Sequence, residues 1–428
     1  MAKDKKINLL FDATVLSAQR RSGIYNVAYE LLQKFQKDDE FNLKLYCSSN
    51  QLVLLKKNLK GELAHFSSLP LLNETNYNPF IAREEYLYFK YQKACEKNKF
   101  IKKYIIISKK LINHFLLNLC NLMKKNYFLS ELKDTDVFFS PCFKIPDIIN
   151  QQAQIKKFVI LYDAIPLVLQ EYKVDNKHWF SQLCQSLNIN DTYFAISEYT
   201  KNDFIKYFPF LKQAAIHVIP LATSNNVSKT MIQDFRKAYN LPTSQHYILT
   251  ICNAEPRKNL NMMINSFVDF IKKDKIKDLV FLIGGHNQKK LEKDILEYGE
   301  YAQYIKPIGY VEDCYLAQLY SNAEWFVYTS QYEGFGMPPL EAMSCGSPVI
   351  TGNNSSLPEV VGDAGIMIDC MDIDAHVKAY EKYYFDEDFR KEMSAKALNH
   401  ARQFSWEKTY KIIKNNIKDT INEVNYED

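Results

Sequence analysis

Long apolar runs are missing from this chain of 428 residues. A helix that crosses a bilayer needs about 20 consecutive apolar residues, and the longest apolar stretch, Leu111–Met123, is interrupted by polar residues. The nine cysteines form no Cys-x-x-Cys pair and no His/Cys cluster with zinc-ligand spacing. Since the N-terminal residues also show no secretory leader, we expect a cytoplasmic protein whose cysteines are reduced.

Internal repeats and low-complexity tracts are absent as well, which leaves an ordinary globular protein. Hydrophobic residues make up 47% and charged residues 24% of the chain, and a chain of this length is expected to form two domains. The net charge of +4 is distributed unevenly, because residues 83–126 contain eleven Lys and Arg against three Glu. The rest of the chain is therefore slightly acidic.

Short apolar runs that end in loops alternate with helical patterns along the whole chain. In the first half these strand candidates are 7–11, 136–140, 158–162, 193–196 and 216–219. In the second half they are 247–251, 279–283, 304–308, 325–329, 348–351 and 365–368. Strands that alternate with helices indicate parallel sheets with helices on both faces. We therefore predict an α/β fold with two Rossmann-like domains.

The strand–helix alternation restarts after a polar stretch at residues 221–245, where we place the domain boundary. We predict a first domain at 1–222, which contains a basic helical segment at 83–126. We predict a second domain at 223–405 and a final amphipathic helix at 406–428.

The most informative stretch is SQYEGFGMPPLEAMSCGSPVI, residues 330–350, which directly follows a predicted strand. Gly334 and Gly336 allow a tight loop, and Pro338 suits the first turn of a helix. A loop between a strand and a helix N-terminus offers backbone N–H groups and the positive end of the helix dipole to a phosphate. We therefore expect this loop to bind a phosphorylated ligand.

Two acidic residues accompany this loop. Glu333 precedes it and would point at the bound ligand, whereas Glu341 lies about one turn into the helix and would accept hydrogen bonds from a ribose diol. The alternative is that both are solvated surface carboxylates. The glycine loop and the paired prolines favour the ligand-binding interpretation.

Two adjacent cations, Arg257 and Lys258, follow a strand in the stretch ICNAEPRKNLNMMINSF, residues 251–267. The carboxyl ends of parallel strands are where open α/β sheets bind ligands. The bidentate fork of Arg and the point charge of Lys together suit a diphosphate. In isolation the sequence PRKN is more often a solvated turn, but opposite Glu333 and Glu341 in the same sheet it predicts a phosphate clamp.

These segments carry a family resemblance. EGFGMPPLEAM, together with EPRKN and GSPVITGNNSSLPEVVGDAG, resembles the family-4 retaining glycosyltransferases of the GT-B fold. The resemblance covers residues 245–410 and is weaker in the first half, in RSGIYNVAYELL, YDAIPL, ISEYTKND and VIPLA. It implies two Rossmann-like domains that face each other across a cleft, with the last helix crossing back to the first domain.

The resemblance also implies roles for individual residues. Glu341 would bind the ribose hydroxyls, and Glu333 would contact the donor sugar. Arg257 and Lys258 would neutralise the diphosphate, and Asp163 would lie near the reacting centre. The remaining expected contact residues are Gly23, Gly309, Tyr310, Val311, Gly334, Phe335, Gly336, Met337 and Pro338 on the donor side, and Tyr162 and Ser197 on the acceptor side.

The implied reaction is the retaining transfer of a hexose or deoxyhexose from a nucleotide-diphosphate sugar to a glycan or lipid-linked acceptor, in bacterial surface polysaccharide biosynthesis. We expect no cofactor and no metal, because the cations stabilise the leaving diphosphate. Asp372 and Asp374 are the nearest match to an Asp-x-Asp metal motif, but they fit a helix N-cap better. Related enzymes commonly have His-Asp where Tyr162 and Asp163 stand, so the donor sugar stays open. They frequently have Gly where Cys252 stands, and a small thiol there is expected to alter only strand packing.

Residues 83–126 support two interpretations with equal weight. They form either a surface that docks on anionic lipids at the inner face of the cell membrane or a solvated helical face that covers the first domain. We expect no nucleic-acid partner, since no nucleic-acid motif is present. A nucleotide-sugar epimerase and a non-catalytic nucleotide-sugar-binding protein are the alternatives to a transferase. A phosphorylase is disfavoured because no pyridoxal-binding lysine motif is evident.

Overall fold

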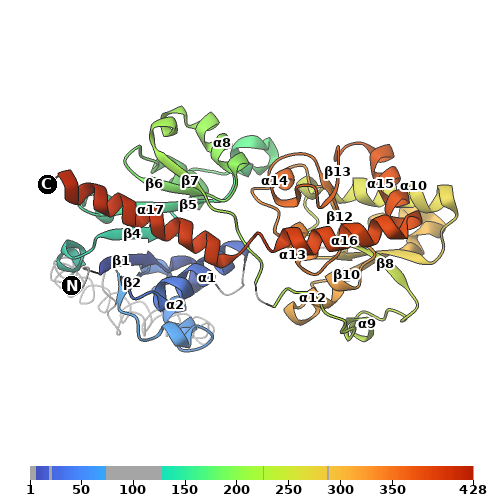
Figure 1. Ribbon diagram of the computed structural model, residues 1–428, viewed down its shortest axis with the longest axis horizontal. Coiled ribbons are helices and arrows are strands. Elements are labelled where there is room, and N and C mark those ends of the chain that lie inside the picture. Colours follow the sequence, from blue (N-terminus) through green and yellow to red (C-terminus); the bar gives the residue numbers. More distant parts are fainter. Residues whose placement is uncertain (1–5, 19–21, 74–127, 225, 287–288, 428) are drawn as a thin grey trace, which may run out of the picture.

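The computed structural model describes residues 6–18, 22–73, 128–224, 226–286 and 289–427. The predicted basic segment at 83–126 lies outside these residues. The described chain forms two α/β domains that lie end to end, and the C-terminal helix runs back along the first domain (Figure 1). Among the helices of the described residues, none combines the length and the apolarity that a membrane crossing requires.

The first domain is built on a seven-stranded sheet with the strand order β3-β2-β1-β4-β5-β6-β7. All of its strand pairs are parallel. The strands are β1 (Ile7–Asp12), β2 (Phe41–Tyr46), β3 (Leu71–Leu72), β4 (Val137–Ser140), β5 (Lys156–Leu161), β6 (Thr192–Ala195) and β7 (Ala215–Val218). β2 was not predicted, because it alternates buried and more exposed residues near the sheet edge and has no continuous apolar run.

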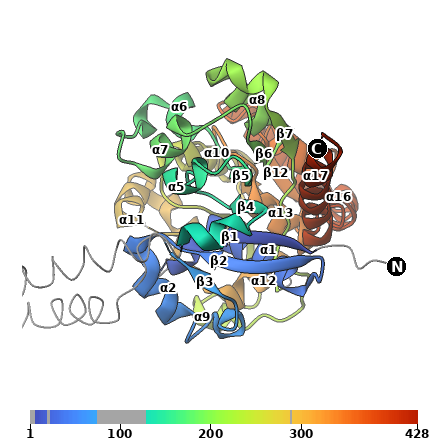
Figure 2. The same cartoon turned by 90° about the vertical axis from the view of Figure 1, so that its left-hand side faces the viewer.

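Helices cover both faces of this sheet, as the alternation of side chains along β1 requires. Leu9 and Phe11 pack in one hydrophobic cluster, whereas Leu10 packs in the other. Figure 2 shows α17 on one side of the sheet and α5, α6 and α7 on the other. The helices of this domain are α1 (Gly23–Lys37), α2 (Leu52–Asn58), α5 (Asp147–Asn150), α6 (Ile165–Val168), α7 (Trp179–Gln185) and α8 (Glu198–Tyr207).

The second domain has a six-stranded parallel sheet with the order β10-β9-β8-β11-β12-β13. Its strands are β8 (His246–Ile251), β9 (Leu279–Gly284), β10 (Ile305–Gly309), β11 (Phe326–Tyr328), β12 (Val349–Gly352) and β13 (Gly365–Ile368). The helices are α9 (Phe235–Ala238), α10 (Leu260–Asp274), α11 (Lys289–Asp294), α12 (Asp313–Ser321), α13 (Met337–Ser344), α14 (Leu357–Val361), α15 (Ile373–Phe385) and α16 (Glu387–Ala401). Every strand predicted for this half forms, within about one residue of its expected ends.

The C-terminal helix α17 (Trp406–Glu427) packs on the first domain, as predicted. The ring of its Tyr410 lies 5.1 Å from that of Phe35 in α1, and its hydroxyl donates to Asp38 at 2.9 Å. Lys414 forms ion pairs with Asp38 and Glu40, each at 2.5 Å. The last helix therefore ties the end of the chain to its first helix.

Candidate functional site

Arg257 and Lys258 lie after the carboxyl end of β8, in a short 3-10 turn that leads into α10. Asn259 follows them in the left-handed conformation, with a φ of 59°. Its Nδ2 donates to the carbonyls of Thr329 at 3.1 Å and Cys370 at 2.6 Å. These bonds hold the turn against the loops that follow β11 and β13, so both cations are presented at the carboxyl edge of the sheet.

Glu333 comes from the loop after β11 and meets both cations. Its Oε1 accepts hydrogen bonds from Lys258 Nζ at 2.6 Å, Arg257 Nη1 at 3.0 Å and the Tyr328 hydroxyl at 2.9 Å. Its Oε2 has no hydrogen-bond partner within the described part of the chain. The sequence predicted the meeting of Glu333 with Arg257 and Lys258, but it gave no sign of Tyr328, which lies inside an apolar strand.

Burial and the neighbouring cations have opposite effects on the pKa of Glu333. Burial disfavours the ionised form of Glu333, but Lys258 and Arg257 outweigh it and hold the pKa of its carboxyl below the ordinary value. Glu333 therefore stays ionised at neutral pH. Lys258 and Glu333 are both buried, and such charges persist in a protein interior only when they are paired.

Asp163 brings a second carboxylate to this cluster from the first domain. It follows β5, and its Oδ1 accepts a hydrogen bond from the backbone N–H of Ile165 at 3.0 Å. Burial raises the pKa of Asp163, Glu333 adds to the rise, and Arg257 and Lys258 oppose it. All four residues predicted to be catalytic thus lie within electrostatic reach of one another, across the two domains.

Gly334 is needed for a reason that the sequence did not reveal. A Cβ at this position would lie 2.1 Å from the backbone oxygen of Tyr162 and 2.8 Å from the Cβ of Asp163. Its own carbonyl accepts hydrogen bonds from the hydroxyls of Ser197 at 2.7 Å and Thr200 at 3.1 Å. The glycine therefore permits a close approach of the first domain, a requirement that adds to the predicted approach to a ligand.

The rest of the glycine loop leads into α13. Gly336 has a φ of 117°, in the region that favours glycine, and it lies directly before the first turn of the helix. Phe335 is buried, with its ring 6.0 Å from that of Phe404, so only its backbone is available to a ligand. Met337 and Pro338 are half-buried at the start of α13. The loop keeps the strand–loop–helix geometry that was predicted.

Glu341 is held apart from the Glu333 cluster. It is half-buried on α13, and Oε2 accepts a hydrogen bond from the Tyr320 hydroxyl at 2.9 Å. Burial raises the pKa of Glu341 to about 7. The rings of Tyr320 and Tyr328 lie 5.3 and 5.9 Å from the ring of Phe326, so Phe326 packs against both of the tyrosines that bond to the two glutamates.

The residues expected beside the base follow β10. Gly309 has a φ of 69°, and Val311 is buried. The Tyr310 side chain is 57% exposed and stacks on the ring of His286, with 4.7 Å between the ring centroids. His286 was not predicted, and its position after β9 was the only signal. Together the two rings form an exposed aromatic surface at the carboxyl edge of the sheet.

The three other first-domain residues that were predicted as contacts lie in unlike surroundings. Gly23 is exposed at the first residue of α1, where Ser22 acts as the N-cap and accepts from the N–H of Tyr25 at 3.2 Å. Ser197 caps α8, as expected from its sequence position, while its hydroxyl also bonds to the second domain. Tyr162 is buried, and its hydroxyl has no hydrogen-bond partner among the described residues. Burial raises its pKa, so the phenol is neutral.

The structure also settles two smaller expectations. The Asp372 side chain accepts the N–H of Ala375 at 3.0 Å, which confirms that it is a helix N-cap. The buried Cys252 has a pKa raised by burial to about 11, so it is a neutral thiol. Within the residues that the structure describes, no three His, Cys, Asp or Glu side chains gather as a metal site would require.

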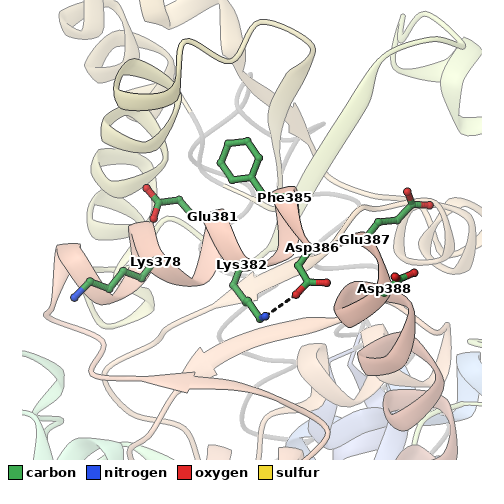
Figure 3. A pocket seen from close by; sticks show the side chains of 7 residues that line it. All are labelled: Lys378, Glu381, Lys382, Phe385, Asp386, Glu387 and Asp388. Atoms are coloured by element: carbon green, nitrogen blue, oxygen red, sulfur yellow. Dashed lines mark hydrogen bonds and ion pairs between the residues drawn. The ribbon is translucent and has the colours of Figure 1, made fainter.

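A separate surface hollow lies where α15 ends and α16 begins (Figure 3). Phe385 is 63% exposed there, and Lys382 bonds to Asp386 at 2.6 Å within the same turn. The hollow contains none of the residues predicted from the sequence. Its lining consists of Lys378, Glu381, Lys382, Phe385, Asp386, Glu387 and Asp388. Several of the charged side chains found there pair with neighbours within the second domain, such as Lys382 with Asp386 and Glu381 with Lys273, so the candidate site is the Glu333 cluster.

Comparison with known proteins gives a family match for most of the second domain. Residues 231–400 match the family model described as Glycosyl transferases group 1. The chain is 29% identical over 296 residues to the O-antigen chain mannosyltransferase B of Escherichia coli, covering 66% of this chain and 74% of that protein. It is 28% identical over 264 residues to the serotype-specific mannosyltransferase WbdA of Escherichia coli, covering 59% of this chain but only 32% of WbdA.

Solved structures match over nearly the whole chain. A sucrose-phosphate synthase from Thermosynechococcus elongatus aligns with a TM-score of 0.64 at 14% identity, covering 98% of this chain and 100% of that one. WaaG, a glycosyltransferase involved in lipopolysaccharide biosynthesis, aligns with a TM-score of 0.61 at 11% identity, covering 96% and 99%. At these identities the likeness shows the fold, in which two Rossmann-like domains face each other.

Proposed function

We propose that the protein is a retaining, metal-independent glycosyltransferase of surface polysaccharide biosynthesis, since its residues 231–400 match the Glycosyl transferases group 1 model. It transfers a hexose or deoxyhexose from a nucleotide-diphosphate sugar to a glycan or lipid-linked acceptor. Relatives named O-antigen chain mannosyltransferase B and serotype-specific mannosyltransferase support a mannose donor as the first to be tried.

The observation that carries this proposal is the meeting of Arg257 and Lys258 with Glu333 opposite Asp163. Arg257 Nη1 is occupied by Glu333 and the Tyr332 carbonyl, whereas Nη2 has no partner among the described residues. The guanidinium and the Lys258 ammonium can therefore turn remaining N–H groups toward a diphosphate. As the bond between the anomeric carbon and the diphosphate breaks, negative charge grows on the leaving oxygen, and preorganised cations stabilise it.

The carboxylates have complementary roles in this proposal. Glu333 Oε1 already accepts three hydrogen bonds, so Oε2 is the atom that accepts a hydroxyl of the donor sugar. Asp163, on the other domain, orients the acceptor hydroxyl. The acceptor oxygen bonds to the anomeric carbon on the face that the diphosphate leaves, and its proton passes to the departing phosphate oxygen. The configuration is retained, and no covalent nucleophile is needed.

We assign the binding of the nucleoside to residues of the second domain that lie outside the Glu333 cluster. The ribose hydroxyls bond to Glu341, and the base lies on the exposed Tyr310–His286 pair. The backbone N–H groups at the start of α13 face the diphosphate. These groups all belong to the second domain, which therefore holds the nucleoside, while Gly23 lets the first domain approach the donor phosphates.

Incubating the full chain with UDP-, GDP- and dTDP-sugars, including a mannose donor, tests the activity. We expect nucleotide release and transfer in the presence of EDTA, and a product whose anomeric configuration, measured by NMR, matches that of the donor. Lys258→Ala and Glu333→Ala should each lower transfer by about 100-fold or more, the scale for losing a transition-state charge contact. Lys273→Ala, at an exposed position late in α10, should leave transfer unchanged.

Any other result of these assays contradicts a specific part of the proposal. Unchanged turnover in both site variants removes the site assignment. Interconversion of nucleotide sugars without transfer indicates an epimerase, and nucleotide binding without turnover indicates a non-catalytic binding protein. An inverted product, or transfer that EDTA abolishes, overturns the retaining or the metal-independent part alone.

We also propose that the protein acts in the cytoplasm at the inner face of the cell membrane. Lipid-linked acceptors would be reached there, and the basic residues 83–126 would be attracted to anionic lipid. Co-sedimentation with anionic vesicles should therefore pellet the wild type but not a Lys102/Lys103/Lys109/Lys110→Glu variant. Equal pelleting of the two proteins, or of neither, contradicts this location.

A further inference from the structure

The loop that carries Glu333 is tied to α8 of the first domain on both sides of the glutamate. On one side, the Tyr332 hydroxyl donates to Asp203 Oδ2 at 2.5 Å, and both residues are buried. On the other side, the Gly334 carbonyl accepts from the Ser197 hydroxyl at 2.7 Å. Glu333 therefore sits between two hydrogen bonds that exist only while the domains touch.

A third contact joins the same helix to α14, and the two helices are neighbours across the domains (Figure 1). The Glu359 carboxylate accepts the backbone N–H of Glu198 at 2.8 Å through Oε2 and that of Tyr199 at 2.7 Å through Oε1. Ser197, the N-cap residue of α8, accepts the N–H of Thr200 instead. The carboxylate thus binds the N–H groups that the helix's own cap leaves open, at the positive end of the helix dipole.

These contacts reach the candidate site without belonging to it. Asp203 and Glu359 make no hydrogen bond to Arg257, Lys258 or Glu333 in the described structure. They act on Glu333 only through the backbone of its neighbours in the loop. Opening of the domains would break all of these bonds together and remove the ties to the first domain on both sides of Glu333, which leaves the loop held only by its own domain through Ser355 and Ser356.

We propose that Glu359, Asp203 and Tyr332 are positioning residues that make the placement of Glu333 depend on closure of the two domains. The inference rests on the proposed function in one respect, which is that correct placement of Glu333 is needed for transfer. Removing Glu359 should shift the closing equilibrium by about 10-fold toward the open form, the scale for one charge-assisted hydrogen bond. The groups proposed to bind the nucleoside lie in the second domain, so binding of the nucleotide sugar should change little.

The test compares Glu359→Ala with Glu387→Ala. Glu387 also lies in the first turn of a helix, but it pairs with Lys391 at 2.7 Å within the same domain. Small-angle X-ray scattering of the nucleotide-free chain should give a larger radius of gyration for Glu359→Ala only. Its kcat should fall about 10-fold, while KM for the nucleotide sugar changes less than about 2-fold.

Two conservative variants guard against a folding defect. Tyr332→Phe removes only the hydroxyl and should lower kcat in the same way, while Glu359→Gln, which keeps the size of the side chain, should have a smaller effect than Glu359→Ala. Wild-type scattering and kcat in both Glu359→Ala and Tyr332→Phe would overturn the inference. Scattering needs no substrate, so a wild type that transfers no sugar refutes the proposed function while the closure test still stands.

Discussion

Four ionisable residues from two domains, namely Asp163, Arg257, Lys258 and Glu333, lie within electrostatic reach of one another. Lys258 is buried and bonds to both Tyr328 and Glu333. Replacing one member leaves its partners as buried charges without compensation, which costs more free energy than the pair contributed. Such a cluster is a poor way to stabilise a fold. Its presence at the carboxyl edge of a sheet fits a ligand that brings its own charge.

Glu341 gives a pH-dependent prediction about stability. Its pKa is raised by burial from 4.5 to about 7, so the folded protein keeps a proton that the unfolded chain loses between these values. The folded state then binds more protons in this window, and the free energy of unfolding falls as pH rises through it. The fall assigned to this group is at most about 3 kcal/mol.

Urea unfolding of the wild type and of Glu341→Gln at pH 5 and pH 8 measures this effect. Glutamine keeps the shape and can still accept from Tyr320, but it does not titrate. The free energy of unfolding should therefore fall less for the variant between the two pH values. Parallel falls in the two proteins would show that Glu341 does not titrate in this window.

At the scale of elements, the glycine loop between β11 and α13 meets two demands at once. It must turn into a helix, for which Gly336 has a positive φ, and it must touch the other domain at Gly334. Ser356 Oγ donates to the carbonyls of Glu333 at 2.9 Å and Phe335 at 2.7 Å. The loop is thus fastened to its own domain through backbone carbonyls and to the first domain through Gly334.

Gly334→Ala should therefore impair transfer without unfolding the second domain. The added methyl group would lie 2.1 Å from a backbone oxygen of the first domain, and a rigid backbone cannot yield cheaply. A displacement of about 1 Å at a catalytic loop can lower the rate by about 100-fold, so we expect a loss of that order in a transfer assay.

Gly61→Ala is the matched control. A Cβ there would make only ordinary contacts at 3.7 Å, so its transfer rate should equal that of the wild type. Wild-type transfer by Gly334→Ala would mean that the close approach of the domains is not needed for the reaction. Thermal unfolding of both variants separates a local effect from a global one.

At the scale of the whole molecule, the chain passes between the domains twice. The first passage lies between β7 and β8, and the second lies between α16 and α17. The two are fastened together, because the buried Thr409 of α17 donates to the Pro220 carbonyl at 2.5 Å. The domain closure proposed above would pivot about this pair of passages, and α17 would move with the first domain, to which Lys414 binds it.

Local patterns were enough to predict most of the architecture. Apolar runs such as 279–283 and 325–329 form central strands because a strand buried on both faces has to be apolar throughout. β2 at Phe41–Tyr46 was not predicted from the sequence, since a strand near the sheet edge with polar residues on one face has no continuous apolar run. The helix caps at Ser197 and Asp372 were readable because a cap depends only on residues three positions away.

The sequence by itself determined the two sheets, the caps and the residue types of the charged cluster, because each depends on neighbours along the chain. Only the tertiary structure decided which residue meets which. It placed Asp163 within electrostatic reach of Glu333, brought Gly334 into contact with the first domain, and joined Glu359 to α8. These residues are far apart in the sequence, and their relative positions are set by how the two domains pack against each other.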